Sequence, residues 1–470
     1  MLQTLPKTAI STGPWSLLQA RLQGAVIAPE DPRYDEARRA WNLNVDQRPA
    51  VIVVPKSAAD VVQAVRFARR EGLGVAVQAT GHGTVRPANG GLLILTSDMQ
   101  GVTVDAATQT ARIEAGVKWG VVLEKTQAMG LAPLLGSSAD VGAVGYTLGG
   151  GMGWLARKYG LSTDSVNYFE VITTAGQLLR ASHTENSDLF WGLRGGGGSL
   201  AIVTAMEIKL YPVTTVYGGN LFYPIEQAKE VITRYREWLP TLPDELTSSF
   251  VLMNFPPIPD VPDFLRGQSF VMVRGCYSGP VAQGEALLDY WRGWRKPLID
   301  DFKVMPFSQV ALISNEPVEP IAAHSSTAWL GELSDEAIDI LIEAGQASSG
   351  SPLAFLEVRH AGGAIARPQA SAYSNREGTL NMQMVGMVFS PETQQVLLDH
   401  FSQVKQTLQP HLTGRVYLNF LEGQESQMQI KNGFTPEAYQ RLTQLKAKYD
   451  PENILGYSHN ILPARPDNLR

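Results

Sequence analysis

Short β-branched runs alternate with amphipathic segments over the first part of the chain. The run VIVV at residues 51–54 is strand-like, and SAAD, from Ser57, is a capping-box-like start for a helix that ends near Gly72. The strings GVAVQA, GLLILT, GVTVD and TARIEAGV follow, each bounded by glycine or polar turns. The pattern predicts several short strands around one early helix.

A second helix is expected from about Trp119 to Met129, with Gly130 at its C′ position. Farther along, NYFEVITTAGQLLRAS predicts a hairpin that turns at its central Ala-Gly, and GSLAIVTAMEIKLYPV predicts a strand. Together these elements predict an α+β lobe, rich in tight turns, up to about residue 214.

From Thr215 the strand-like runs become longer and alternate with amphipathic helices. The longest runs are SSFVLMNF, SFVMVRGCYSG, PLAFLEVRH and LNMQMVGMVFS. Helices are expected near residues 225–238, 281–294, 335–347 and 391–408. This alternation predicts a second lobe, an antiparallel sheet covered by helices on one face. One more amphipathic helix, in TPEAYQRLTQLKAKYDPENIL, is expected to end before its proline.

The composition argues against several classes of partner. The chain has 470 residues, a net charge of −6 and a pI near 5.7 without any basic run, which disfavours nucleic acid and anionic membranes as partners. Cys276 is the only cysteine and the histidines show no paired spacing, so neither an internal disulfide nor a metal site is expected. No secretory signal pattern and no apolar run of roughly 18 residues occurs. We therefore expect a cytoplasmic protein that binds small molecules.

Two loops are dense in glycine, GSSADVGAVGYTLGGGMG at 136–153 and QATGHGT at 78–84. Such density forfeits side-chain packing and costs conformational entropy, so a compensating role is expected. Glycine allows backbone N–H groups to approach an anion closely, and the two loops are candidates to bind a pyrophosphate without any lysine. The alternative is a set of tight turns, because glycine is a common turn residue.

Other nucleotide and hydrolase motifs are weak or absent. The string GMGWLA, from Gly151, matches G-x-G-x-x-A, but it follows glycines rather than a buried strand and Gly160 ends any helix after two turns, so a Rossmann fingerprint is rejected. No G-x-x-x-x-G-K-[ST] loop occurs, and G-x-S-x-G is absent at a strand-to-helix turn. His82, between Gly81 and Gly83, has little packing to make and is either an exposed loop residue or a functional group.

The order of these motifs carries a resemblance to a known family. ATGHG is followed by GSSADVGAVGYTLGGGMGWLARKYGLSTDSV, then by ENSDLFWGLRGGGGSLAIVT, and near the end by VYLNF and YDPENIL. From about residue 46 onward the chain resembles the berberine bridge enzyme-like branch of the vanillyl-alcohol oxidase and p-cresol methylhydroxylase (PCMH) superfamily of flavoproteins. The resemblance implies a PCMH-type FAD-binding domain at 1–214, with its core at about 46–214. It also implies a substrate domain at 215–412 and a C-terminal segment, 413–470, that returns to the FAD domain.

The same resemblance implies covalent attachment of the flavin. In this family the histidine at the His82 position is bonded to the flavin 8α-methyl carbon, a bond that a neutral imidazole nitrogen can form. Many members add a cysteine in the pattern G-x-C-x-x-V-G, where this chain has Ser138, so one covalent link is expected. The usual Gly-Gly-His-Ser reads TGHG here. Val141 lies where oxidases of the family tend to have valine, which favours an oxidase that releases hydrogen peroxide.

Further cofactor contacts implied by the resemblance lie mainly in the two glycine-rich loops. These candidates are Ala79, Thr80, Gly81, Gly83, Thr84, Gly136, Ser137, Ser138, Val141, Gly142, Gly145, Thr147, Gly149, Gly150, Tyr159, Val203 and Asn460. His459 also stands where it can approach the isoalloxazine. Arg157 and Asp164 resemble family positions near the cofactor, although surface charge is the simpler account.

The candidate catalytic groups lie in two later segments. Tyr417 of VYLNF matches a Tyr-x-Asn motif whose tyrosine often serves as the base in the family, although a free tyrosine titrates near pH 10. Asn419 is expected on the same face, to bind substrate or flavin or to support a turn. Glu357 and Arg359 share one face of a strand, either as a base with its orienting partner or as an exposed ion pair.

These observations predict an FAD-dependent oxidase. It would dehydrogenate a small organic alcohol, amine or phenol by hydride transfer to flavin N5, with O2 as the final acceptor and H2O2 as the product. The alternatives are a flavin dehydrogenase or natural-product cyclase that does not use O2, and a ligand-binding protein that keeps the flavin fold. Candidates to line an apolar pocket, or else to form core, are Met253, Phe255, Met272, Met384 and Met387.

Overall fold

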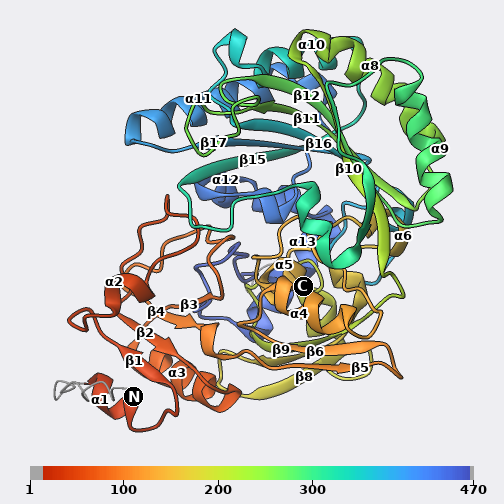
Figure 1. Cartoon of the computed structure of the whole chain (residues 1–470). Helices are drawn as coiled ribbons and strands as arrows, with labels where there is room; N and C mark the ends of the chain where they lie inside the picture. The colour runs from red at the N-terminus through yellow and green to blue at the C-terminus, as the bar shows by residue number, and fades with distance from the viewer. Residues whose placement is uncertain (1–13, 466–470) are drawn as a thin grey trace, which may run out of the picture.

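Two lobes form the molecule, and the α+β class expected from the sequence is confirmed (Figure 1). The computed structural model describes residues 14–465, so the first 13 residues of the expected FAD domain lie outside it. The lower lobe in Figure 1 holds a four-stranded and a five-stranded sheet, and the upper lobe holds an eight-stranded sheet. Within residues 14–465 no helix has the length and apolar character needed to cross a bilayer.

The four-stranded sheet follows the order β1-β2-β4-β3. Strands β2, β4 and β3 are parallel, while β1 pairs with β2 in the antiparallel sense. Helix α3 begins as expected after Ser57, whose Oγ accepts from the backbone N–H of Asp60, and ends at Gly72, which has φ +68°. The elements are α1 (Pro14–Gln19), β1 (Ala25–Ile27), α2 (Tyr34–Ala37), β2 (Val51–Val54), α3 (Ala58–Glu71), β3 (Val75–Gln78) and β4 (Leu92–Leu95).

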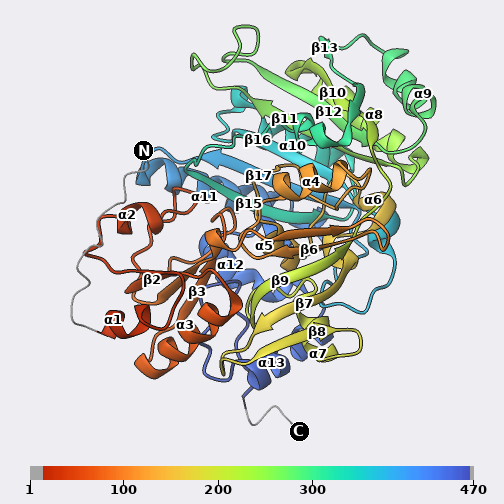
Figure 2. The same cartoon turned by 60° about the horizontal axis from the view of Figure 1, so that its bottom comes forward.

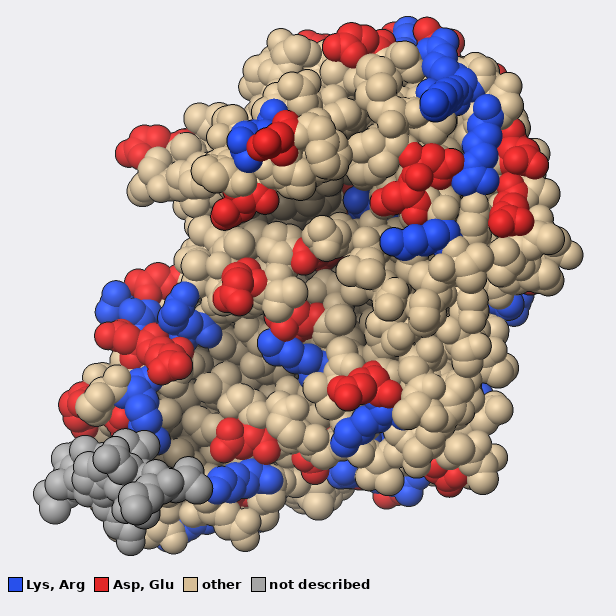
Figure 3. Space-filling model, in the orientation of Figure 1, with Lys and Arg blue, Asp and Glu red and all other residues tan. Residues whose placement is uncertain are grey.

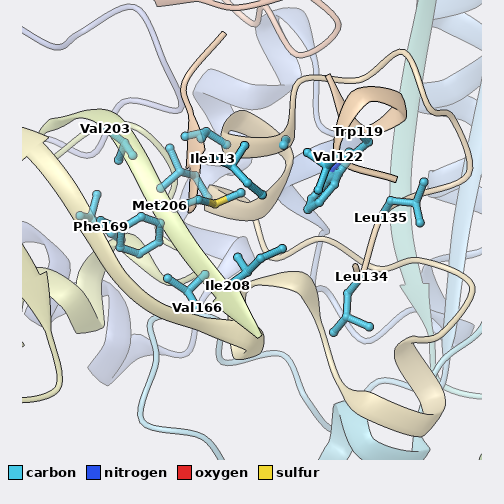
Figure 4. Packing of buried hydrophobic residues seen from close by; sticks show 14 of the residues in the cluster. Ile113, Trp119, Val122, Leu134, Leu135, Val166, Phe169, Val203, Met206 and Ile208 are labelled. Carbon is cyan, nitrogen blue, oxygen red and sulfur yellow. The ribbon is translucent and has the colours of Figure 1, made fainter. Parts of the chain in front are cut away.

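The five-stranded sheet is antiparallel, in the order β5-β6-β9-β7-β8. Its core is one cluster that contains Phe169 and Ile208 of the sheet together with Trp119 and Val122 of helix α4 (Figure 4). The expected hairpin turns at Gly176, and the helix after GMG ends at Gly160 after a single turn. The elements are β5 (Val102–Asp105), β6 (Thr110–Glu114), α4 (Trp119–Gln127), α5 (Ala143–Leu148), α6 (Ala156–Tyr159), β7 (Val166–Ile172), β8 (Leu178–Ser182), α7 (Ser187–Leu193) and β9 (Ile202–Lys209).

The third sheet is antiparallel throughout, in the order β13-β10-β12-β11-β16-β17-β15, with β14 also paired to β10. Two strands were not predicted from the sequence, β10, which contains two glycines, and β15, which reads AHSSTAWL. Their composition does not favour a strand, and pairing with neighbouring strands stabilises them. The strands are β10 (Thr215–Pro224), β11 (Leu246–Asn254), β12 (Ser269–Tyr277), β13 (Ile299–Asp300), β14 (Lys303–Pro306), β15 (Ala323–Leu330), β16 (Phe355–His360) and β17 (Leu380–Met387).

Helices cover one face of this sheet, as the sequence predicted. Phe250, Val358 and Met382 pack against them in one core, because residues opposite each other in register share a face. Arg359 alternates with Val358 and therefore points to the other face, toward the lower lobe. The covering helices are α8 (Ala228–Trp238), α9 (Val281–Arg292), α10 (Asp335–Gly345) and α11 (Pro391–Thr407).

The C-terminal segment runs back to the lower lobe, where α13 lies beside α7 (Figure 2). The expected tail helix is α13 (Pro436–Tyr449), preceded by the short α12 (Gly423–Gln429). Beyond it, the backbone N–H of Val75 in β3 donates to the carbonyl of Ile454 at 2.8 Å. The fully buried Lys446 donates to the carboxylate of Asp450 at 2.6 Å and fixes this return. Elements from both ends of the chain therefore build one lobe.

Candidate functional site

A cavity of about 420 Å³ lies between the two lobes. Its lower wall is formed by the glycine-rich loops 79–85 and 136–149, and its upper wall by residues of β15, β16 and β17. Residues 417–422 and 455–459 of the returning segment close it from a third side. A hollow between the lobes is visible in Figure 3, where acidic and basic side chains are interspersed over the surface. The lobes and both glycine loops thus meet at one site.

His82 lies on the wall of this cavity, with 16% of its side chain exposed. Its ring stacks on Trp41, with centroids 3.9 Å apart and planes inclined by 17°. Its Nε2 is 3.2 Å from Asp140 Oδ2. Burial lowers the pKa of His82, and the nearby Asp140 carboxylate only partly offsets this. The imidazole is therefore neutral near pH 7, the form that has a free lone pair for bond formation.

Gly81 makes this arrangement possible. It has φ +87°, and a Cβ there would lie 2.6 Å from Ala40 Cα, closer than a side chain tolerates. The close approach lets the Trp41 backbone N–H donate to the carbonyl of Thr80 at 3.0 Å. The TGHG stretch thus allows the backbone at Trp41 to pack closely against the loop that carries His82.

Most glycines of loop 136–153 accommodate protein side chains rather than an anion. Cβ atoms at Gly136 and Gly151 would lie 2.9 and 2.6 Å from the ring of Tyr146. In contrast, Gly83 and Gly145 line the cavity, and a Cβ at either position would meet nothing within 4 Å. The buried Oγ of Ser458, in the returning segment that closes the cavity, has no hydrogen-bond partner. Free space next to two glycines, together with an unpaired hydroxyl in the same cavity, is what a bound nucleotide cofactor would require.

Most of the sequence-predicted cofactor residues line this cavity. They are Ala79, Thr80, Gly81, His82, Gly83, Thr84, Gly136, Ser137, Ser138, Val141, Gly142, Gly145, Gly149 and Val203. Thr147, Gly150, Tyr159 and Asn460 do not line it, although His459, the neighbour of Asn460, does. The structure therefore brings most of the predicted residues together at one cavity, and their contact with a cofactor stays a prediction.

Local packing explains the residues that lie elsewhere. The Thr147 hydroxyl donates to the carbonyl of Ala143 at 2.8 Å, as helical threonines often do. Gly150 faces the ring of Tyr373, which a Cβ would approach to 2.8 Å. The Tyr159 ring packs on another tyrosine of its own lobe, with centroids 4.2 Å apart.

Arg157 and Asp164 are neither surface charges nor cavity residues. Arg157 is 5% exposed and donates through Nε to the carbonyl of Leu246 in the upper lobe. Asp164 binds the guanidinium of Arg376 through both carboxylate oxygens, at 2.7 and 3.0 Å. These buried contacts join the two lobes, so the prediction of exposed charge was wrong for both residues.

Glu357 and Arg359 form a buried cluster, which rules out the exposed ion pair considered from the sequence. Arg359 Nε donates to Glu357 Oε2 at 2.8 Å, and Arg274 Nη1 lies 3.5 Å from Glu357 Oε1. Although burial opposes it, these two guanidinium groups lower the pKa of Glu357. Glu357 lies behind the cavity wall, whereas Arg359 reaches the cavity. Glu357 is therefore placed to orient Arg359 and not to accept a substrate proton.

Tyr417 lines the cavity, but its hydroxyl oxygen is already occupied. It accepts hydrogen bonds from the backbone N–H groups of Gly151 and Met152, at 3.1 and 2.8 Å, and from Asn419 Nδ2 at 3.1 Å. Burial raises the pKa of Tyr417 to about 12, even though these donors oppose the shift. An oxygen that accepts three donors and holds its proton to such a high pH is a poor base near neutrality.

Asn419 reaches Tyr417 by a different geometry from the shared strand face that was expected. Residues Leu418–Phe420 form a 3₁₀ turn, not a strand. Asn419 also donates to the carbonyl of Tyr146, and a Cβ at Gly149 would lie 1.7 Å from Asn419 Oδ1. Asn419 therefore fixes the returning segment onto the glycine-rich loop.

Sequence reasoning missed two prominent residues of the cavity wall, Trp41 and Glu422. Burial raises the pKa of Glu422 to about 7, and one carboxylate oxygen accepts from the backbone N–H of Ser325 at 3.1 Å. Glu422 follows VYLNF closely, but no local pattern reveals that this carboxyl faces a cavity. Trp41 precedes the region that carried the family resemblance.

The apolar candidates divide between the two faces of the upper sheet, and none lies on the cavity wall. Met384 belongs to the core under the covering helices. Met253, Phe255 and Met272 pack together on the opposite face. Met387 is partly buried at the end of β17.

Within residues 14–465, no group of three or more His, Cys, Asp or Glu side chains is arranged to hold a metal ion.

Two known protein families match the segments of the chain that form this cavity. An FAD binding domain family matches residues 49–182, and a berberine and berberine-like family matches residues 416–462. An FAD-linked oxidoreductase of Dictyostelium discoideum is 28% identical over 94% of this chain and 95% of its own length. The (R)-6-hydroxynicotine oxidase of Paenarthrobacter nicotinovorans is 26% identical, over 94% of this chain and 97% of the relative.

The fold is also that of a solved oxidase. Glucooligosaccharide oxidase from Acremonium strictum superposes with a TM-score of 0.83 at 21% sequence identity, over 96% of this chain and 100% of that one. Both matched families frame the cavity, since residues 49–182 contain its glycine loops and residues 416–462 contain the segment that closes it. The chain thus contains an FAD binding domain and a berberine-like segment, and it is similar over almost its whole length to FAD-linked oxidoreductases.

Proposed function

We propose that this enzyme is an FAD-dependent oxidase that acts on a small organic alcohol, amine or phenol and carries its FAD on a single covalent bond from His82. The observation that carries the proposal is a neutral, stacked imidazole on a cavity wall beside open glycine positions. One relative that aligns over almost its full length is an (R)-6-hydroxynicotine oxidase, and this similarity supports the reaction class.

The two glycine loops would hold the cofactor. When bound, FAD accepts two electrons from the substrate and passes them to dioxygen. Gly83 and Gly145 leave space on the lower wall, and Ser458 offers a free hydroxyl on the returning segment. Val141 also lies on the wall, and its small side chain supports access for dioxygen.

A single covalent link follows from the chemistry of residue 138. The Acremonium enzyme is described by a 6-S-cysteinyl, 8α-N1-histidyl FAD. Here the family's cysteine position holds Ser138, whose Oγ accepts a hydrogen bond from the backbone N–H of Asp140 at 3.2 Å. A hydroxyl is a far weaker nucleophile than a thiolate, so only His82 is suited to form the bond.

We assign proton removal from the substrate to Glu422. Its carboxylate faces the cavity and one of its oxygens binds Ser325, whereas the Tyr417 oxygen is occupied by three donors. A carboxyl that titrates near 7 is matched to base catalysis at neutral pH. Arg359, which Glu357 orients, adds a guanidinium that can bind a substrate oxygen as negative charge develops on it.

Acid precipitation tests the cofactor and its attachment together. The purified protein should be yellow, the acid pellet should stay yellow, and the intact mass should exceed that of the chain by one FAD. His82→Ala should release the colour to the supernatant. A colourless protein after expression with riboflavin would refute the flavin, and a colourless pellet would refute only the bond.

The electron acceptor needs a separate measurement. Substrates that bleach the flavin without oxygen should yield one hydrogen peroxide per turnover in air. Bleaching without peroxide in air would instead indicate a dehydrogenase or a cyclase. Failure of a broad panel of alcohols, amines and phenols to bleach the flavin would favour a ligand-binding role.

A further inference from the structure

Asp140 contacts the imidazole that carries the proposed covalent bond. Its Oδ2 lies 3.2 Å from His82 Nε2, and its Oδ1 lies 2.5 Å from Lys118 Nζ. We propose that Asp140 is a positioning residue that keeps the proton of His82 on Nε2 and so makes Nδ1 the nitrogen that bonds to the flavin. This inference rests on the proposed covalent attachment.

The tautomer follows from what each atom can donate or accept. An ionised carboxylate only accepts hydrogen bonds, so the His82 nitrogen that faces Asp140 must carry the hydrogen. Burial keeps the ring neutral, which leaves the other nitrogen with its lone pair. Among residues 14–465 no protein atom makes a hydrogen bond to Nδ1 of His82. Nδ1 is therefore the available nucleophile.

The ring is also fixed in direction. The stacked Trp41 indole restricts tilting of the imidazole, and the contact with Asp140 restricts rotation within the plane. Trp41 is itself held by Thr80, the second residue before His82 along the chain. Side-chain partners of this kind fix tautomer and orientation for metal-binding histidines, and the same physics applies to a covalently bound flavin.

Asp140 does not depend on Lys118 alone for its position. The backbone N–H of Asp140 donates to Ser138 Oγ at 3.2 Å. The carbonyls on either side, of Ala139 and Val141, accept from backbone N–H groups at the start of α4, at 2.7 and 3.0 Å. The loop is therefore a rigid support, and Ser138, in the family's cysteine position, stabilises the turn that aims Asp140 at His82.

The bond-forming step balances with dioxygen as oxidant. The Nδ1–C8α bond forms as one C–H bond of the 8α methyl group breaks, and the proton of that C–H bond leaves to solvent. The electron pair of that C–H bond enters the ring system, and dioxygen takes up that pair together with two protons from solvent to give hydrogen peroxide. The imidazole becomes a cation as Nδ1 is alkylated, and the Asp140 carboxylate stabilises that charge through the Nε2 hydrogen.

The experiment follows attachment rather than turnover. Apoprotein from riboflavin-limited cells is mixed with FAD in air, and samples are acid-precipitated over time to give the covalent and the released fraction. Asp140→Ala should bind FAD but attach it roughly 10–100-fold more slowly than the wild type. Asp140→Asn keeps the size and one acceptor and should fall between the two. In the isolated wild-type flavopeptide, NMR should show attachment at Nδ1.

Lys118→Met is the matched control, because it removes the ion-pair partner of Asp140 and leaves the contact with His82 intact. Its attachment rate should equal that of the wild type. Wild-type-like rates in both Asp140 variants, or attachment at Nε2, would overturn the inference. If Asp140→Ala binds no FAD, Asp140→Asn decides by the same rate. Absence of any adduct in the wild type would instead refute the proposed covalent bond.

Discussion

Replacement of Tyr417 by phenylalanine distinguishes a structural clamp from a catalytic base. The substitution keeps the ring, which is 1% exposed, and removes only the oxygen that accepts from Gly151, Met152 and Asn419. No cavity larger than one oxygen atom is created. The perturbation therefore isolates the hydrogen bonds between the returning segment and the glycine-rich loop.

The magnitude follows from the donors left without a partner. Asn419 Nδ2 retains its bond to the carbonyl of Tyr146, so two backbone N–H groups lose their acceptor in a buried site. Each unpaired buried donor costs about 1–3 kcal/mol, so Tyr417→Phe should destabilise the protein by about 2–6 kcal/mol. If Tyr417 is only a clamp, kcat/KM at 25 °C should fall by less than about tenfold, whereas loss of a general base costs roughly 10²–10⁴-fold.

Thermal unfolding and steady-state kinetics measure the two effects in parallel. Tyr373→Phe is the matched control, because Tyr373 packs edge-on to Tyr417 and its buried hydroxyl has no hydrogen-bond partner. The control should be as stable as the wild type or slightly more so. A Tyr417→Phe variant of unchanged Tm whose kcat/KM falls by more than about 100-fold would refute the clamp and restore Tyr417 as the base.

Three further substitutions test separate parts of the site. Gly145→Leu fills open space, so the apoprotein should keep its circular dichroism spectrum and lose bound flavin; a yellow variant would contradict this. Because a base acts when ionised, kcat/KM should rise with pH through about 7, and Glu422→Gln should abolish that rise. Asp450→Asn leaves the fully buried Lys446 charge unpaired and should cost about 3–5 kcal/mol in unfolding measurements; an unchanged Tm would contradict it.

Much of the fold could be predicted because its signals are local. The caps and apolar spacing of α3 and α13 lie within each helix, and the long strand-like runs of β11, β12, β16 and β17 mark strands regardless of their neighbours. The same locality explains why the two glycine loops and His82 could be selected as candidates, and the structure brings them together on one cavity wall. Strand β15 was missed because its polar residues become a strand only through pairing with β17.

The roles of single residues were decided by contacts that sequence patterns do not encode. Tyr417 is a clamp because it meets Gly151, 266 residues earlier in the chain. Glu422 titrates near 7 because it is buried, in contact with Ser325, 97 residues earlier in the chain. Sequence determined the glycine-rich loops and most of the helices and strands, since neighbouring residues set backbone preference. Tertiary structure alone decided which glycines stay open, which oxygens are free and which carboxylate faces His82, because burial and hydrogen-bond partners depend on residues far apart in sequence.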